Sequence, residues 1–458
     1  MFQLYLLLRL KNFGRIVIEL GIFRIVFLTI LTVAAIMILF LAENRFVIPV
    51  VCVLLLASYH NYRKDKEFLH TLTSHLPVFL IKEYTLITLP FAGMEMIKGY
   101  SHKPMGTVVL GTHLGNFSKE DSLKYVEAIK YAVRNGIYSI DGAINYRGMC
   151  SERDEGVALA ELMNSGIITR EEVFISSKAG LLYGDISAKL PPMKYLSEKL
   201  ENKGISIEDF SEYEGLFQTL NPAFYEIALN KSLENLGLEM IDVYYIHIPE
   251  ITKLKLTEDE FYEKMEMLIR WYETKCFEGK IRYYGIAFEF MVEEPFENKW
   301  HIEIERIKNI ARKVSGEKNH FKYILFEYNI MCDWADTVKS QMIDGVKMTM
   351  IEACKALELE TVASMPFAMG DGFKKYALSD MLDFVSKKMN HVIVGSKNPK
   401  HIEEILRCWR GNLSECSGRQ RFSGTGLVEI AKRNNVSKRT IYRYKAYYEE
   451  MKEAESEK

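Results

Sequence analysis

The spacing of apolar and polar positions divides this chain into parts of different character. Between residues 106 and 412, short apolar runs alternate with longer segments whose apolar positions recur at helical spacing. This pattern predicts eight strands, each followed by a helix. The predicted strands are Thr107–Thr112, Gly136–Asp141, Val173–Lys178, Ile241–Ile246, Arg282–Ala287, Lys322–Tyr328, Glu360–Ser364 and His391–Val394. The predicted helices are 119–135, 152–165, 222–236, 258–275, 302–314, 348–357, 379–388 and 400–407.

Such regular alternation is typical of an α/β protein with parallel strands. A (β/α)8 TIM barrel fits the length of this region, because that fold usually occupies roughly 250 residues or more. A doubly wound sheet would alternate in the same way, but no GxGxxG follows a predicted strand. We therefore predict a TIM barrel over residues 106–412.

Two apolar runs precede the barrel, at residues 25–42 and 46–60. The first carries no charge and is long enough to cross a bilayer, whereas the second contains Pro49. Basic residues flank the pair on both sides, which predicts that both ends face the cytoplasm. We predict a two-helix transmembrane hairpin within residues 1–70, a membrane location, and a barrel on the cytoplasmic side. Buried soluble helices, and a remnant of a longer membrane protein, are the alternatives; residues 71–105 are predicted to be a linker or an interfacial segment.

The C-terminal segment 426–450 is predicted to form two short helices joined by a turn. Its sequence from Glu429 to Lys445 resembles the helix-turn-helix of recombinases and small regulators. The second helix would carry the basic residues Lys438, Arg439, Arg443 and Lys445, where DNA contacts are expected. A basic helix that only caps the barrel is an equal alternative, so DNA as a partner stays open.

Composition narrows the function classes only a little. Apolar residues make up 48% and charged residues 26%, with a formal net charge of −2, so there is no global bias towards nucleic acid. The seven cysteines form no CxxC pair and no metal-ligand spacing. We expect no disulfide framework, no metal site and a reducing compartment.

Four titratable residues fall at or just beyond the C-terminal ends of predicted strands, where barrel enzymes place their chemistry. Asp141, Lys178 and His247 end or follow strands two, three and four, and Tyr146 lies in the loop after strand two. A tyrosine has a pKa near ~10 and gives up its proton readily only if a nearby cation favours the phenolate. A lysine can supply that cation, an aspartate can hold the lysine, and a histidine can polarise a carbonyl oxygen. The set suits reduction of a carbonyl group, with Tyr146 as the proton donor.

Several sequence blocks resemble those of the aldo-keto reductase family. The blocks are DGAINY (141–146), ISSK (175–178), DVYYIH (242–247), YGIAF (284–288) and GSKNPKHIEEIL (395–406). The resemblance implies an NAD(P)H-dependent oxidoreductase that reduces an aldehyde or ketone, with NADPH as the usual cofactor and NADH as the second option. It implies a cofactor site at Gly111, Thr112, Phe288, Gly395, Ser396, Lys397, Asn398 and His401.

The chain departs from the family at the cofactor site. The three polar residues that usually hold the nicotinamide amide correspond to Ala287, Phe288 and Leu325, and the usual lysine and arginine near the 2′-phosphate correspond to Gly395 and His401. Because of these differences from the family, a second function stays open. In this alternative the barrel is not catalytic, senses a nicotinamide cofactor or metabolite, and regulates through the DNA-binding-like C-terminal segment.

The long segment 179–220 follows the lysine strand. Because it leaves the catalytic end of a strand and is too long for a passive connection, we expect it to wall the substrate site. A packing insert on the barrel rim is the alternative.

Overall fold

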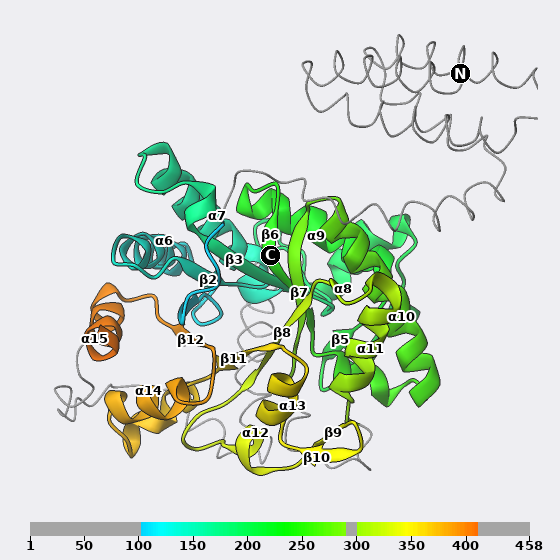
Figure 1. Ribbon diagram of the computed structural model, residues 1–458. Helices are drawn as coiled ribbons and strands as arrows, with labels where there is room; N and C mark the ends of the chain where they lie inside the picture. The colour runs from blue at the N-terminus through cyan, green and yellow to red at the C-terminus, as the bar shows by residue number, and fades with distance from the viewer. Residues whose placement is uncertain (1–101, 290–299, 411–458) are drawn as a thin grey trace, which may run out of the picture. The chain divides into compact units, whose positions relative to one another are not determined.

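The computed structural model describes residues 102–289 and 300–410, which contain a closed barrel of eight parallel strands (Figure 1). Each barrel strand pairs with the next one along the chain, and the last pairs with the first. The predicted barrel is therefore confirmed. Its strands are β1 (Val108–Gly111), β2 (Ser139–Asp141), β3 (Phe174–Ala179), β6 (Ile241–His247), β7 (Ile281–Ala287), β8 (Phe321–Glu327), β11 (Glu360–Ser364) and β12 (His391–Gly395).

The helices lie outside the strands, as Figure 1 shows for α6, α7, α10 and α15. The eight that correspond to the predicted helices are α6 (Lys119–Arg134), α7 (Cys150–Asn164), α9 (Pro222–Leu236), α10 (Glu258–Phe277), α11 (Ile304–Ser315), α13 (Met350–Ala356), α14 (Leu378–Ser386) and α15 (Pro399–Arg410). Their ends follow local chemistry. In α9, the Asn221 side chain accepts from the Ala223 amide, proline occupies the first turn, and Gly237 closes the helix with φ of 65°.

Side chains point alternately to the two faces of each strand, and this separates two apolar cores, one inside the barrel and one between the barrel and the helices. On β1, Val109 points into the barrel, while Val108 and Leu110 face the surrounding helices. The interior is filled by Met105, Val109, Phe174, Val243, Tyr245, Ala287, Tyr323, Leu325 and Val362. The interior is therefore closed by packed side chains, and the space for chemistry lies above them, at the C-terminal ends of the strands.

Two small antiparallel hairpins interrupt the alternation, and the sequence pattern did not predict either. The first joins β4 (Ser211–Tyr213) to β5 (Leu216–Gln218), and the second joins β9 (Gln341–Ile343) to β10 (Val346–Met348). Their strands are only three residues long, too short to show a repeating apolar pattern.

The predicted membrane hairpin (25–42 and 46–60), the segment 71–101 and the helix-turn-helix-like segment 426–450 lie outside the described residues. Within residues 102–289 and 300–410, no helix combines the length and the apolar character needed to cross a membrane.

Candidate active site

Neighbouring strands bring the predicted catalytic residues to one end of the barrel. Asp141 on β2 pairs with Ser176 on β3, and Lys178 lies two residues further along the same face of β3. His247 ends β6, which pairs with β3 on its other side. Because side chains alternate along a strand, Val243, Tyr245 and His247 share the inward face, with the histidine at its open end.

Lys178 forms a buried ion pair with Asp141. Its Nζ lies 2.5 Å from Asp141 Oδ2 and donates to the Gly142 carbonyl oxygen at 2.7 Å, with only 1% of the residue exposed. The other carboxylate oxygen of Asp141 accepts from Ser176 Oγ at 2.8 Å. Burial alone would lower the pKa of Lys178, but the Asp141 carboxylate, helped by the nearby Tyr146 oxygen, outweighs it and the pKa lies above its ordinary value. The lysine is therefore a fixed ammonium at neutral pH.

Tyr146 lies half-buried among the other three residues. The Lys178 Nζ is 4.9 Å from the centre of the Tyr146 ring, and the His247 ring packs edge-on at 5.9 Å between centroids. The structure thus brings the four predicted catalytic residues together. It adds His113, whose ring contacts Tyr146 edge-on at 4.6 Å. His113 lies two residues after the end of strand β1, so the rule for strand ends would have found it.

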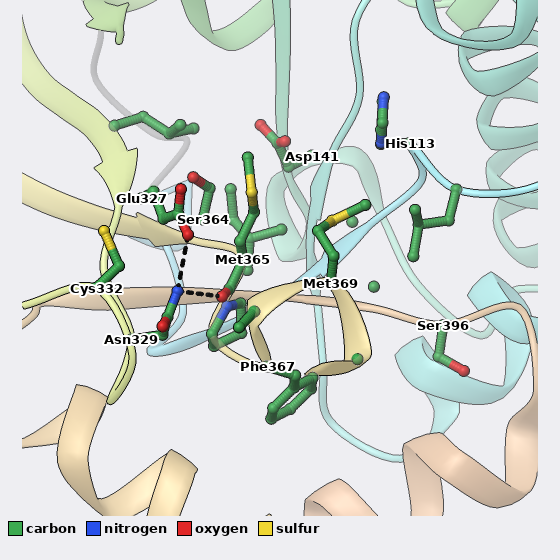
Figure 2. Close-up of a pocket in the computed structure, with 18 of the residues that line it drawn as sticks. His113, Asp141, Glu327, Asn329, Cys332, Ser364, Met365, Phe367, Met369 and Ser396 are labelled. Atoms are coloured by element: carbon green, nitrogen blue, oxygen red, sulfur yellow. Dashed lines mark hydrogen bonds between the residues drawn. The ribbon is translucent and has the colours of Figure 1, made fainter. Parts of the chain in front are cut away.

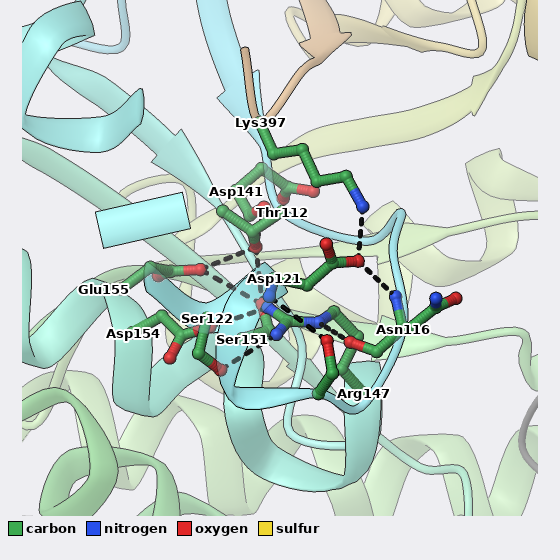
Figure 3. A network of polar contacts seen from close by, with 11 residues as sticks. Thr112, Asn116, Asp121, Ser122, Asp141, Arg147, Ser151, Asp154, Glu155 and Lys397 are labelled. Atoms are coloured by element: carbon green, nitrogen blue, oxygen red, sulfur yellow. Dashed lines mark hydrogen bonds and ion pairs between the residues drawn. The ribbon is translucent and has the colours of Figure 1, made fainter. Parts of the chain in front are cut away.

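The turn after Tyr146 has an unusual backbone that buried polar contacts hold in place. Arg147 and Met149 have positive φ, at 50° and 71°, a region that side chains rarely adopt. The buried Arg147 guanidinium pairs with Asp154 at 2.6 Å and donates to the Asn116 carbonyl oxygen at 3.0 Å (Figure 3). These contacts hold the backbone of the turn that directly follows Tyr146.

A cavity of about 720 Å³ opens above the four residues. Its apolar walls come mainly from the loops after β8 and β11, and Figure 2 shows Met365, Phe367 and Met369 between Glu327 and Ser396. The apolar lining residues are Leu114, Ile248, Ala287, Phe288, Leu325, Met331, Cys332, Trp334, Met365, Pro366, Phe367, Ala368, Met369, Phe373, Leu378, Ile393 and Ile405.

The loop after β11 is strained where it meets the cavity. Met365 and Met369 have φ of 52° and 56°. Asn329, fully buried, donates to the Met365 carbonyl oxygen and to Glu327 Oε1, both at 3.0 Å (Figure 2). The amide of one loop thus fixes the conformation of the next, and with it the cavity wall.

Comparison with known proteins agrees with this geometry. The family model described as "Aldo/keto reductase family" matches residues 104–417. The chain belongs to the aldo/keto reductase family. A curated relative from Candida tropicalis is named as an NAD(P)H-dependent D-xylose reductase, so the predicted enzyme class and nicotinamide cofactor agree with the family.

Among curated reductases, the chain is 27% identical over 248 residues to the glyoxal reductase of Bacillus subtilis, covering 52% of this chain and 67% of that protein. It is 29% identical over 165 residues to the silkworm (Bombyx mori) aldo-keto reductase AKR2E4, covering 36% of this chain but only 40% of that protein. A solved structure of silkworm aldo-keto reductase AKR2E5 complexed with NADPH is 18% identical, with a TM-score of 0.42, covering 66% of this chain and 78% of that one.

The residues assigned to the cofactor fall into two groups in this aldo/keto reductase. Those that line the cavity are Gly111, Phe288, Gly395, Ser396 and His401. Those that do not are Thr112, Lys397 and Asn398. Thr112 is turned into a buried network, Lys397 forms an ion pair with Asp121, and Asn398 Oδ1 accepts from the Lys400 amide at the start of α15.

The two ends of the cavity differ in how well they suit a nicotinamide cofactor. At one end, the Ser396 hydroxyl and the N-terminus of α15, which starts with Pro399, suit a phosphate group. At the other end, Ala287, Phe288 and Leu325 line the cavity with apolar side chains that offer the nicotinamide amide no hydrogen bond. The phosphate end therefore suits the cofactor, while its amide would rest against an apolar surface.

The expectation that residues 179–220 wall the substrate site is wrong. No residue of this segment is among those that line the main cavity. Its apolar side chains, such as Leu181, Tyr183 and Leu190, are buried against the rest of the fold. The burial of these apolar side chains fits the alternative, in which the segment is a packing insert.

Proposed function

We propose that this protein reduces an aldehyde or ketone to an alcohol with NAD(P)H, using Tyr146 as the proton donor. The observation that carries the proposal is the position of the Tyr146 ring, which lies close to both the buried Lys178 ammonium and the His247 ring in the lining of the cavity. A phenol next to a fixed cation is the arrangement that general acid catalysis by tyrosine requires.

Each residue then has a defined task. When bound, the cofactor supplies the hydride that adds to the carbonyl carbon of the substrate. Tyr146 donates its proton to the carbonyl oxygen, and Lys178 stabilises the phenolate that remains. Asp141 keeps the lysine charged and aimed. His247, whose ring packs edge-on against the tyrosine ring, orients the carbonyl oxygen.

The cofactor would lie along the cavity from Phe288 to the start of α15. Phe288 and Leu325 would pack against the nicotinamide ring, and Ser396 together with the first turn of α15 would hold a phosphate group. Without polar partners for the amide, we expect weaker cofactor binding than three hydrogen bonds would give.

The lining of the cavity supports a substrate with an apolar body. Apart from the ends of the strands, its walls are mainly methionine and aromatic side chains, among them Met331, Trp334, Phe367 and Met369. Flexible methionines adapt to varied shapes. We therefore propose aromatic or branched aliphatic carbonyl compounds rather than small polar sugars.

Steady-state oxidation of NADPH by the purified full chain, against a panel of aldehydes and ketones, tests the function. Turnover should be found with apolar carbonyl compounds and lost in Tyr146→Phe. Fluorescence titration of the same protein with NADPH and NADH separates weak binding from none. If neither cofactor binds at millimolar concentration, the reductase proposal fails and the non-catalytic barrel replaces it.

The tether and the C-terminal segment remain proposals from the sequence. We propose that residues 25–60 anchor the protein in a membrane with both ends in the cytoplasm, since basic residues flank both apolar runs. Reporter fusions at Asp65 and Lys458 should both report the cytoplasm, and an external signal from either would contradict this. Salt-sensitive DNA retention that weakens when Arg439 and Arg443 are replaced by alanine would support the helix-turn-helix reading.

A further inference from the structure

Glu155 is a fully buried acid that the catalytic steps above do not use. It lies on α7 with none of its surface exposed, directly behind the segment that follows β2. A Cβ atom added at Gly142 would come within 2.4 Å of Glu155 Oε1, so the carboxyl group packs against the glycine backbone. Gly142 is the residue whose carbonyl oxygen accepts from the Lys178 ammonium.

A short network of hydrogen bonds connects Glu155 to the catalytic aspartate (Figure 3). Glu155 Oε1 lies 2.7 Å from Thr112 Oγ1 and 3.2 Å from Ser151 Oγ. The two hydroxyl oxygens are 2.5 Å apart. Thr112 Oγ1 also lies 3.0 Å from the Asp141 carbonyl oxygen, to which it donates. The path therefore runs from Glu155 through Thr112 to the main chain of Asp141.

Counting hydrogens shows which form of Glu155 fits the network. Thr112 and Ser151 have one hydroxyl hydrogen each. If Glu155 were ionised, both hydroxyl groups would be drawn to the carboxylate. The Asp141 carbonyl oxygen would then lose the threonine hydroxyl and keep only the bond from the Thr112 main-chain amide, at 3.1 Å. A protonated Glu155 adds a third hydrogen: it donates to Thr112, Thr112 donates to Asp141, and Ser151 donates to either neighbour.

We propose that Glu155 is a positioning residue of the reductase, which as a neutral carboxylic acid holds the main chain of Asp141 and Gly142 through Thr112. Those two residues in turn hold the Lys178 ammonium beside Tyr146. Ionisation of Glu155 withdraws the Thr112 hydroxyl from the Asp141 carbonyl oxygen and adds a negative charge behind the catalytic ion pair. The proposal rests on the proposed carbonyl reduction.

The surroundings of Glu155 favour the neutral form. Burial, the largest cause, raises its pKa together with the nearby carboxyl groups of Glu152 and Asp141. The hydrogen bonds from Thr112 and Ser151 oppose them, and the net pKa is about 8. Tyr125 of α6 also faces the group. Glu155 is therefore mostly protonated at neutral pH and ionises in a range that an assay can reach.

Glu155→Gln tests the role, since glutamine has the same shape and stays neutral at every pH. The matched control is Glu152→Gln, one turn earlier on α7. Glu152 is equally buried, but its carboxylate accepts from Ser177 at 2.6 Å and from Asn235 at 2.9 Å, away from Thr112. For each variant, kcat at saturating NADPH is divided by the wild-type value from pH 6.5 to 9.5. Any ionisation of Tyr146 affects both proteins and cancels in the ratio.

For Glu155→Gln, the ratio should be near one at pH 6.5 and rise about tenfold by pH 9, since a group is about ten-to-one ionised one unit above its pKa. For Glu152→Gln it should not rise, because Glu155 is still present and ionises at lower pH once the neighbouring carboxyl group is gone. A flat ratio for Glu155→Gln, or an equal rise in both variants, would overturn the proposal.

A second measurement keeps the proposal testable if the wild type shows no reductase activity, in which case the proposed function alone has failed. The pKa of Glu155 in the folded protein, about 8, lies above the ordinary 4.5. Its stabilising effect is thus complete below pH 4.5 and is lost as the pH rises through 8. The melting temperature of the wild type should therefore fall relative to Glu155→Gln between pH 6 and 9. A constant difference would overturn the neutral-acid assignment.

Discussion

Replacing Lys178 by methionine removes the ammonium next to Tyr146 while keeping an unbranched side chain. In the wild type the Lys178 Nζ lies 4.9 Å from the centre of the tyrosine ring. Two unit charges about 5 Å apart attract each other by about 3 kcal/mol at an effective dielectric constant of ~20. This attraction stabilises the phenolate left after proton transfer, so its loss should lower kcat/KM on the order of 10²-fold.

The same substitution leaves Asp141 buried without its cation. Breaking a buried ion pair by removing one partner typically costs about 3–5 kcal/mol of stability, which could mask the effect on catalysis. The double variant Asp141→Asn with Lys178→Met removes both charges, and the Ser176 hydroxyl can still donate to the remaining side-chain oxygen of residue 141. We expect the double variant to recover most of the melting temperature that the single variant loses, while kcat/KM stays low in both.

The assay is NADPH oxidation with the best substrate of the panel, together with a melting curve and a cofactor titration for each variant. The reasoning would be refuted by a double variant that is folded, binds NADPH like the wild type, and keeps kcat/KM within about threefold of it. In that case the proton would reach the carbonyl oxygen without help from the lysine.

Three further predictions follow from the same structure. Tyr146→Phe should lower kcat by ~10²–10⁴-fold with an almost unchanged Kd for NADPH, because only the acid is removed; a retained rate would assign the proton to another group. Phe288→Asn should tighten NADPH binding by roughly 1 kcal/mol through a new bond to the amide, read from quenching of Trp334 at the cavity wall, whereas weaker binding would mean that ring packing matters more. Asp154→Asn should lower the free energy of unfolding by about 3–5 kcal/mol, because it leaves the buried Arg147 without its carboxylate partner. The control Lys387→Ala breaks an exposed ion pair with Asp383 and should change the free energy of unfolding by less than about 1 kcal/mol. Denaturant unfolding measures both, and equal effects would contradict the role of burial.

Local patterns along the chain were sufficient to predict the barrel and the proximity of the four proposed catalytic residues. Apolar periods of two and of about 3.6 residues are properties of single elements, so they survive in the sequence whatever the tertiary packing. The strand-end rule then placed Asp141, Lys178 and His247 together, since parallel strands carry their C-terminal residues to one rim. Helix ends such as Asn221 and Gly237 depend on neighbouring residues only.

The remaining features depend on contacts between segments far apart in the chain. Lys397 lies in the segment assigned to the cofactor phosphate, yet Asp121, on a helix near the start of the barrel, binds it instead. Thr112 leaves the cavity because Glu155 and Ser151 offer its hydroxyl a buried network, which no spacing within a strand reveals. Residues 179–220 were expected to wall the substrate site, but the walls of the cavity come mainly from the loops after β8 and β11. The strained turn in the loop after β11 is held by a hydrogen bond from Asn329 in the loop after β8, far away in the sequence. A sequence pattern reports which face of an element is apolar, while the partner that a polar side chain finds is decided only when the chain has folded.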